Sequence, residues 1–373
     1  MGRKLAQQID AAEGQTAKGL AGVRLRRLKV TNFRALDHFE MEFPSPKFPD
    51  EPDVFVFGSS NGLGKTSLLE ACALLYLGRL RTHTDMRLPF AFGDPPARVE
   101  FLDLLVRAGH QKAAIEGEFE VGESPLQGHV EIDRDSRSAY SLMGVNLIDS
   151  WPTQIGDPGS VTSGFLRTLT GAASDPFVCP DLMYFHSYRK VREGNVELGK
   201  MVGSGNGGSA RVGTVGAFKL AVLRSMMGQK GLLEGVEGAE AGQVVEKLNG
   251  LLEEYAAVSI AKLRPSADNT IELRVSAGAG KSYPFDGLSS GQKEIISTLF
   301  LIWLHTHDAP GIVLIDEPEL HLNAEWQVGI VRTLAKLVPG NQLILATHSE
   351  DVFGSVEEDR RFMLRPAGGG THD

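Results

Sequence analysis

The sequence predicts an α/β protein built around a buried, mixed β-sheet. Three short apolar runs, at residues 53–57, 311–315 and 342–346, are typical of strands buried on both faces of a sheet. Each run ends in a polar motif, and after the first run apolar residues recur at helical spacing from Lys65 to about Gly78. We therefore expect a strand–loop–helix unit first, and polar motifs gathered at one edge of the sheet.

The loop of that unit, residues 60–66 (SNGLGKT), is glycine-rich and opens directly into the helix. Backbone N–H groups in such a loop, together with the positive end of the helix dipole, form a binding site for a phosphate group. Lys65 would reach the β- and γ-phosphates of a nucleotide, and the Thr66 hydroxyl would bind Mg²⁺. Ser59 stands where the usual pattern has a glycine, so we expect a slightly rearranged start of the loop. The residues expected to bind the nucleotide are Asn61, Gly62, Leu63, Gly64, Lys65, Thr66 and Ser67.

Two carboxylates and a histidine follow the other two apolar runs. Asp316 is placed to hold Mg²⁺ through water, beside Thr66. Glu317 points to the other side of the chain, which suits a general base acting on a water in line with the γ-phosphate. His348 can hydrogen-bond the γ-phosphate or that water. The candidate catalytic residues are therefore Glu317, His348 and Lys65, and the candidate metal ligands are Thr66 and Asp316.

A fourth motif, residues 288–292 (LSSGQ), begins an apolar helical run that extends to about residue 306. The amino end of that helix would direct its dipole toward an anion. Ser289 or Ser290 would also cap the helix, because a cap and an anion site use the same N–H groups.

In this order, the four motifs resemble the ATP-binding-cassette (ABC) class of P-loop ATPases, with LSSGQ as the signature motif. Three segments are similar to RecF, SMC and OLD-type ATPases rather than to transporter cassettes: residues 32–34 (NFR), 316–322 (DEPELHL) and 347–349 (THS). The resemblance covers residues from about 24 to 76 and from about 282 to 350. It implies an ABC-type ATPase head, in which an antiparallel β layer covers the mixed sheet in lobe I and lobe II is mainly helical.

The resemblance also implies ATP and Mg²⁺ as ligands, and a dimer that holds two ATP molecules between its heads. The signature residues Ser289, Ser290, Gly291 and Gln292 would then act in trans, on the γ-phosphate bound by the other subunit. Arg34 would contact the nucleotide. Asn323 stands where related proteins have the aspartate or histidine of a dimer-bridging loop. The glutamine loop has three candidates, Gln111, Gln127 and Gln154, and residues 182–189 resemble the segment found at that point in OLD-like proteins.

The same patterns predict the domain organisation. We expect a loosely ordered segment at residues 1–22, lobe I at 23–185 plus 311–366, lobe II at 186–310 and a flexible tail at 367–373. Lobe I should contain a hairpin at 28–33 and 39–43 and strands near 98–106, 112–121 and 129–135; lobe II should contain helices around 213–228 and 242–256 and a hairpin at 258–263 and 270–275. Residues 203–209 read as a flexible loop. Sustained heptads are missing between the glycine-rich loop and the signature, so no long coiled coil is expected.

Composition favours a cytoplasmic protein that is not embedded in a membrane. The 373 residues are 42% hydrophobic and include two cysteines, and no apolar run approaches the roughly 20 residues of a membrane span. The net charge of −9 excludes a uniformly basic surface, so DNA, a partner that the resemblance implies, would bind only to local patches. Candidate patches are Arg24, Arg26, Arg27 and Lys29; Arg79, Arg81 and Arg87; and Arg189, Lys190 and Arg192, although solvated faces are equally expected.

The sequence thus predicts an ATP-hydrolysing head that dimerises around two ATP molecules and acts as a switch in DNA repair, DNA maintenance or antiphage defence. Only 25 residues follow His348, so we expect a separate effector or nuclease protein rather than a fused one. Two alternatives remain open: the nucleotide-binding subunit of a membrane transporter, and a scaffold that binds ATP without hydrolysing it.

Overall fold

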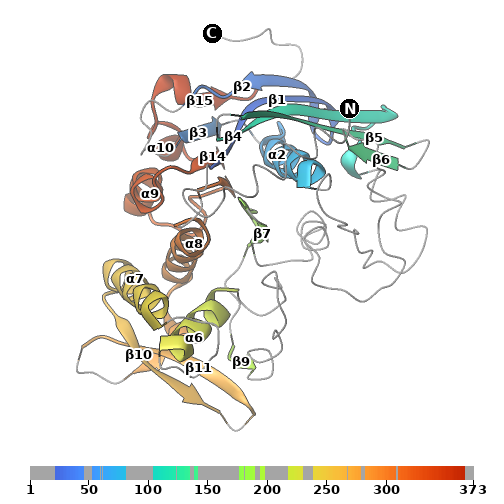
Figure 1. Ribbon diagram of the computed structural model, residues 1–373. Helices are drawn as coiled ribbons and strands as arrows, with labels where there is room; N and C mark the ends of the chain where they lie inside the picture. The colour runs from blue at the N-terminus through green and yellow to red at the C-terminus, as the bar shows by residue number, and fades with distance from the viewer. Residues whose placement is uncertain are drawn as a thin grey trace.

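The computed structural model of the chain describes residues 22–45, 53–58, 60, 62–80, 104–122, 124–134, 138–141, 176–179, 181–189, 194–197, 217–229, 238–266, 268–278, 282–307 and 310–365. Figure 1 shows two sheets with helix α2 (Lys65–Leu80) at one end, a smaller sheet with two helices at the other end, and helix α8 (Ser290–Thr306) between them. The predicted loop at 203–209, the tail at 367–373 and all but the last residue of the segment 1–22 lie outside the described residues.

A six-stranded sheet forms the centre of the fold, in the order β15-β3-β14-β13-β8-β7. Its strands are β3 (Asp53–Gly58), β7 (Phe177–Cys179), β8 (Leu182–Phe185), β13 (Ile312–Asp316), β14 (Gln342–Thr347) and β15 (Arg361–Met363). Every neighbouring pair is parallel except β7 and β8, so the sheet is mixed as predicted. The three predicted apolar strands are confirmed to within one residue.

An antiparallel sheet covers one side of α2, in the order β2-β1-β4-β5-β6. Its strands are β1 (Val23–Phe33), β2 (Leu36–Glu42), β4 (Lys112–Val121), β5 (Ser124–Asp133) and β6 (Ser138–Ser141). Alternating residues of β1, such as Leu28 and Val30, are buried. The predicted hairpin and the strand at 112–121 are present, and the strand predicted near 129–135 is present as β5, which begins five residues earlier.

One predicted helix end and the described part of one predicted strand differ from the structure. Helix α2 continues past Gly78 to Leu80. Gly78 does not end the helix, and its small size instead allows α2 to pack against β5, where a Cβ would collide with the side chain of Val130. The described part of the predicted strand near 98–106 is helical at Leu104 and Leu105, and Val106 forms only an isolated bridge.

The far end of the molecule contains helices α6 (Ala217–Gln229) and α7 (Gly238–Ala256) and a sheet of β9 (Val196–Glu197), β10 (Ser259–Pro265), β11 (Thr270–Ser276) and β12 (Tyr283–Pro284). A short 3₁₀ helix, η1 (Phe285–Gly287), then leads to α8. Both predicted helices and the predicted hairpin are present. The division into two lobes with the boundaries given above stays a prediction.

Two clusters of buried side chains lie on the two faces of the six-stranded sheet. Phe55 and Leu314 belong to the cluster with α2 and the antiparallel sheet, whereas Val56 and Val313 belong to the cluster with α7, α8 and α9 (Ala324–Leu337). This alternation follows from the period of two in a strand, and it explains why the central strands are apolar throughout. After β14 the chain forms α10 (Glu350–Phe353), η2 (Glu358–Arg360) and the edge strand β15. Within the described ranges, no helix is long and apolar enough to cross a membrane.

Candidate functional site

The candidate site lies at the carboxyl edge of the six-stranded sheet, where strands β3, β13, β14 and β8 end side by side. Because these strands are parallel, the motif that follows each of them emerges at the same edge. The structure brings Lys65, Thr66, Asp316, Glu317 and His348 together there, from segments that are up to 283 residues apart.

The glycine-rich loop is shaped by two residues with left-handed backbone conformations. Gly62 has φ of 80° and Gly64 has φ of 95°, values that side-chain-bearing residues rarely adopt. Nothing lies within 4 Å of where a Cβ of Gly62 would be, so the backbone of the loop is accessible at that point. The loop leads directly into α2, whose first turn includes the buried Ser67. An anion could therefore approach the N–H groups at the start of α2 closely. Asn61 lies outside the described residues.

Lys65 is the first residue of α2 and its side chain contacts the motif after β14. Its Nζ lies 3.3 Å from His348 Nδ1 and donates to the Ser60 carbonyl oxygen at 3.4 Å. On the other side of the ring, His348 Nε2 lies 3.9 Å from Glu317 Oε1. Burial lowers the pKa of Lys65, and the nearby carboxylates of Asp316 and Glu317 oppose this shift. The three candidate catalytic residues thus form a continuous chain of polar contacts.

The Thr66 hydroxyl donates to Asp316 Oδ2 at 2.8 Å. Asp316 is 1% exposed, and burial raises the pKa of its carboxyl from 3.8 to about 6. A buried carboxylate beside a hydroxyl offers hard oxygen donors, and a divalent cation would offset the cost of burying its charge. In the parts of the chain that the structure describes, no group of three or more His, Cys, Asp or Glu side chains could hold a metal. The Thr66 hydroxyl and the Asp316 carboxylate fit Mg²⁺, which keeps water ligands and takes its other oxygens from phosphates.

Glu317 occupies a strained position. Its φ is 51°, which is uncommon for any residue other than glycine, and it precedes a proline. Its N–H donates to the Ala346 carbonyl oxygen at 2.8 Å, and its own carbonyl oxygen accepts from Leu320 N at 3.0 Å. Backbone strain of this kind is concentrated at functional sites, where the surrounding contacts impose it.

Glu319 is a site residue that the sequence reasoning missed. Its Oε1 accepts from the backbone N–H of His348 at 2.8 Å and of Ser349 at 3.2 Å. Its Oε2 is buried and has no hydrogen-bond partner in the described part of the chain. Glu319 therefore holds the backbone of the His348 segment at the site. The only available signal was its place in the DEPELHL segment.

Replacing Glu319 by alanine should lower kcat for ATP hydrolysis roughly 10-fold and change the Kd for ATP less than about threefold, because His348 would lose its support while the phosphate loop stays intact. Glu319→Gln keeps an acceptor oxygen and should retain most of the activity. Phosphate release and calorimetric titration with ATP measure the two quantities. Equal kcat values for Glu319→Ala and the wild type would contradict this role.

Arg34 lies in the β1–β2 turn and forms an ion pair with Glu70 of α2, one helical turn after Thr66. Its predicted contact with the nucleotide stays a prediction. Burial of the Glu70 carboxyl raises its pKa from 4.5 to about 7. The charge of Arg34 favours the ionised form of Glu70 and opposes this rise, but its effect is smaller. The signal for Glu70 was a lone carboxylate between apolar residues of α2.

The pKa of Glu70 predicts a pH-dependent stability of the nucleotide-free protein. A carboxyl whose pKa is higher in the folded state binds its proton more tightly there, so the free energy of unfolding should fall as the pH rises from about 4.5 to about 7. The full shift would correspond to about 3 kcal/mol. Urea unfolding on either side of this range should show a smaller difference for Glu70→Gln than for the wild type. If the change in the free energy of unfolding across this pH range is the same in Glu70→Gln and in the wild type, other groups, such as Asp316, cause it.

The signature residues lie at the amino end of α8. Ser289 caps this helix: its Oγ accepts from Gln292 N at 3.2 Å, and Gln292 Oε1 accepts from Ser289 N at 3.0 Å. Ser289 and Ser290 are exposed, whereas Gly291 is buried against the His321 carbonyl oxygen, which leaves no room for a Cβ. The predicted cap is present in the form of a capping box.

Two further predictions from the resemblance can be placed. Asn323 caps α9 by accepting from Trp326 N at 2.9 Å. Gln111 and Gln127 are exposed residues at the antiparallel sheet, where Gln127 donates to Glu118, and Gln154 lies outside the described residues. The glutamine loop therefore stays unassigned. Residues 182–189 contain β8 and do reach the candidate site, beside β13.

The first predicted basic patch is paired with carboxylates. Arg24 and Arg26 contact Asp53, Arg27 contacts Glu40, and Lys29 contacts Glu116. Arg189 is only 4% exposed, so it cannot belong to a DNA-binding surface. Its Nε contacts Glu294 Oε1 of α8 at 2.5 Å, and its Nη1 and Nη2 donate to the carbonyl oxygens of Asp316 and Glu317. Arg81, Arg87, Lys190 and Arg192, and the side chain of Arg79, lie outside what the structure describes.

Part of the chain that forms this site matches a known protein family. Residues 236–353 match the family model "AAA domain, putative AbiEii toxin, Type IV TA system". The predicted resemblance to ATPases is confirmed by this match. The matched segment contains the signature, both carboxylates and His348, and the glycine-rich loop precedes it.

Among curated proteins, the chain is 40% identical over 58 residues to "Retron Ec83 probable ATPase" of Escherichia coli, covering 16% of this chain and 11% of that protein. It is 30% identical over 93 residues to "Septu protein PtuA" of Bacillus thuringiensis, covering 22% of this chain and 23% of that protein. The alignments therefore span less than a quarter of these relatives. A solved SMC head bound to the C-winged helix domain of ScpA is similar with a TM-score of 0.49 and 15% identity, over 89% of this chain and 91% of that chain.

Proposed function

We propose that this protein binds ATP with Mg²⁺ at the carboxyl edge of the six-stranded sheet and hydrolyses the γ-phosphate. The observation that carries the proposal is the convergence of Lys65, Thr66 and Asp316 with Glu317 and His348, through contacts of 2.8 to 3.9 Å. A phosphate loop alone would support binding only. The additional carboxylate and histidine supply what a hydrolytic reaction needs.

Each residue has a role that follows from its position. The N–H groups of the glycine-rich loop and the Lys65 ammonium bind the β- and γ-phosphates. Thr66 and Asp316 hold Mg²⁺, which neutralises phosphate charge when it is bound. Glu317 accepts a proton from the attacking water. His348, which lies between Lys65 and Glu317, donates a hydrogen bond to the γ-phosphate or orients the water.

The proposal includes a dimer with two ATP molecules at its interface. The signature residues support this part of the proposal. Within the single chain, Ser289 and Gln292 hydrogen-bond each other, and the Gln292 side chain donates to the Tyr255 carbonyl oxygen at 3.2 Å. The exposed serines at the amino end of α8 leave a helix terminus that can meet a phosphate from another subunit.

For the biological role, we propose a switch in antiphage defence that acts on a separate effector protein. The likeness to a retron ATPase and to Septu PtuA favours this role over DNA repair. DNA is a weaker candidate partner than the sequence indicated, because the first basic patch is paired with carboxylates and Arg189 is buried.

Phosphate release by the purified protein, with Mg²⁺ and with or without DNA, tests the proposal. We expect phosphate release that requires Mg²⁺. We also expect the turnover per subunit to increase with protein concentration, because each site needs a second subunit. Tight ATP binding without turnover would favour the scaffold instead. Association with a permease in a membrane fraction would favour the transporter subunit.

A further inference from the structure

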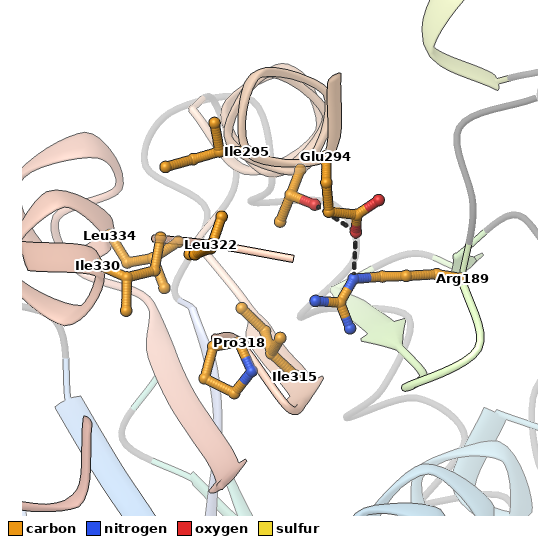
Figure 2. A pocket seen from close by; sticks show the side chains of 9 residues that line it. Arg189, Glu294, Ile295, Ile315, Pro318, Leu322, Ile330 and Leu334 are labelled. Atoms are coloured by element: carbon orange, nitrogen blue, oxygen red, sulfur yellow. Dashed lines mark hydrogen bonds and ion pairs between the residues drawn. The ribbon is translucent and has the colours of Figure 1, made fainter. Parts of the chain in front are cut away.

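Arg189 is located where three elements of the candidate site meet. It follows β8, and its guanidinium is directed toward helix α8 and the end of β13 (Figure 2). Nε contacts Glu294 Oε1 at 2.5 Å, Nη1 donates to the Asp316 carbonyl oxygen at 2.6 Å, and Nη2 donates to the Glu317 carbonyl oxygen at 3.0 Å. Nη1 also donates to the carbonyl oxygen of His186 at 3.0 Å. One buried side chain thus contacts α8, the turn that follows β8 and the backbone of both site carboxylates.

Two of these contacts hold the backbone at Glu317, whose conformation is strained. Glu317 has φ of 51°, and rotation of its backbone would move its carboxylate relative to His348. The planar guanidinium holds two successive carbonyl groups at once, which fixes the peptide groups on both sides of Glu317. A lysine ammonium could not reproduce this planar, forked arrangement.

Helix α8 touches the same loop a second time, at its first turn. A Cβ on Gly291 would collide with the His321 carbonyl oxygen, so the signature glycine lies directly against the segment 316–322. Beside the Arg189–Glu294 pair lies a small, mainly apolar pocket, lined in part by Ile295, Pro318 and Leu322 (Figure 2). Apolar side chains impose little directional preference, so the Arg189–Glu294 ion pair and the close approach at Gly291 define how α8 and the loop are oriented relative to each other.

We propose that Arg189 is a positioning residue through which helix α8 sets the orientation of the Glu317 carboxylate. Ser289, the cap of α8, lies little more than one helical turn from Glu294. Engagement of the signature by a nucleotide on a partner subunit would therefore be transmitted through Glu294 and Arg189 to Glu317. This inference rests on the proposed hydrolysis at a shared interface, and it adds the means by which dimer formation increases the rate.

The test compares turnover per subunit over a range of protein concentrations for the wild type, Arg189→Lys and Glu294→Gln. In the wild type, turnover per subunit should rise as dimers form. Both variants should bind ATP with a Kd within about threefold of the wild type and still dimerise with ATP, but their maximal turnover should be lower by roughly 10-fold or more and nearly independent of concentration. The double variant should lose little more than either single variant, since both changes break one linkage.

Arg274→Lys is the matched control, because Arg274 pairs with Glu272 on β11 and contacts none of the site residues in the interactions described above. It should behave like the wild type. Glu294→Gln keeps a hydrogen-bonding side chain, so this variant still tests the proposal if Arg189→Lys does not fold. The inference is overturned if the variants accelerate with concentration as the wild type does, or if they lose ATP binding to the same extent as turnover. Failure of the wild type to release phosphate would instead overturn the proposed function.

Discussion

Replacing Glu317 by glutamine should slow ATP hydrolysis by roughly 10²-fold or more, because an amide cannot take the proton of the attacking water. ATP binding should persist, since Glu317 contacts His348 rather than the glycine-rich loop. An ATP-bound dimer should therefore accumulate. Phosphate release measures the loss of turnover, and light scattering after size-exclusion chromatography with ATP measures the dimer.

The exposed residue Glu325, in the first turn of α9, provides a matched control. Glu325→Gln makes the same chemical change eight positions along the chain and should hydrolyse ATP at the wild-type rate. Unchanged hydrolysis by Glu317→Gln would exclude this carboxylate as the base. If Glu317→Gln loses turnover but forms no ATP-dependent dimer, the chemical role of Glu317 is supported and the proposed dimer is not.

Replacing Lys65 by alanine should weaken ATP binding by at least about 10²-fold, because a charge-assisted contact to the phosphates disappears. The nucleotide-free protein should not lose stability from the missing charge. Lys65 is 5% exposed and burial lowers its pKa, so its ammonium is costly to bury until phosphates are present. Calorimetric titration with ATP and thermal unfolding without ATP measure these two effects.

The exposed Lys336, near the end of α9, serves as the control for charge. Lys336→Ala should bind ATP like the wild type. Retained binding by Lys65→Ala would show that the glycine-rich loop is an ordinary turn. A large loss of thermal stability in Lys65→Ala would show instead that the ammonium is stabilised within the fold by Ser60 and His348.

The parts of the fold that could be predicted are those with local signals. Strands β3, β13 and β14 are uninterrupted apolar runs, and each one ends at a recognisable motif, so both the strands and the residues gathered at their ends could be inferred. The edge strand β15 gave no such signal. It is three residues long, and it becomes a strand by pairing with β3, about 300 positions earlier in the chain.

Charged residues were predicted less well, because their role depends on partners far away in the sequence. Arg189 was interpreted as part of a basic surface, yet it is buried against Glu294, 105 residues later, and against two backbone carbonyl groups. Glu319 and Glu70 were missed for the same reason. Their partners, His348 N and Arg34, are 29 and 36 positions away and have no fixed spacing that periodicity could reveal.

The left-handed backbone of Glu317 has a consequence for how this protein can change over evolution. A conformation of this kind costs on the order of 1–3 kcal/mol, against a net stability of about 5–15 kcal/mol for a typical domain. Glycine would adopt the same backbone without that cost but would have no carboxylate. Selection for stability alone would therefore favour replacing this residue, and only selection for activity would retain it. The margin of stability that the rest of the chain can lose through mutation is correspondingly smaller.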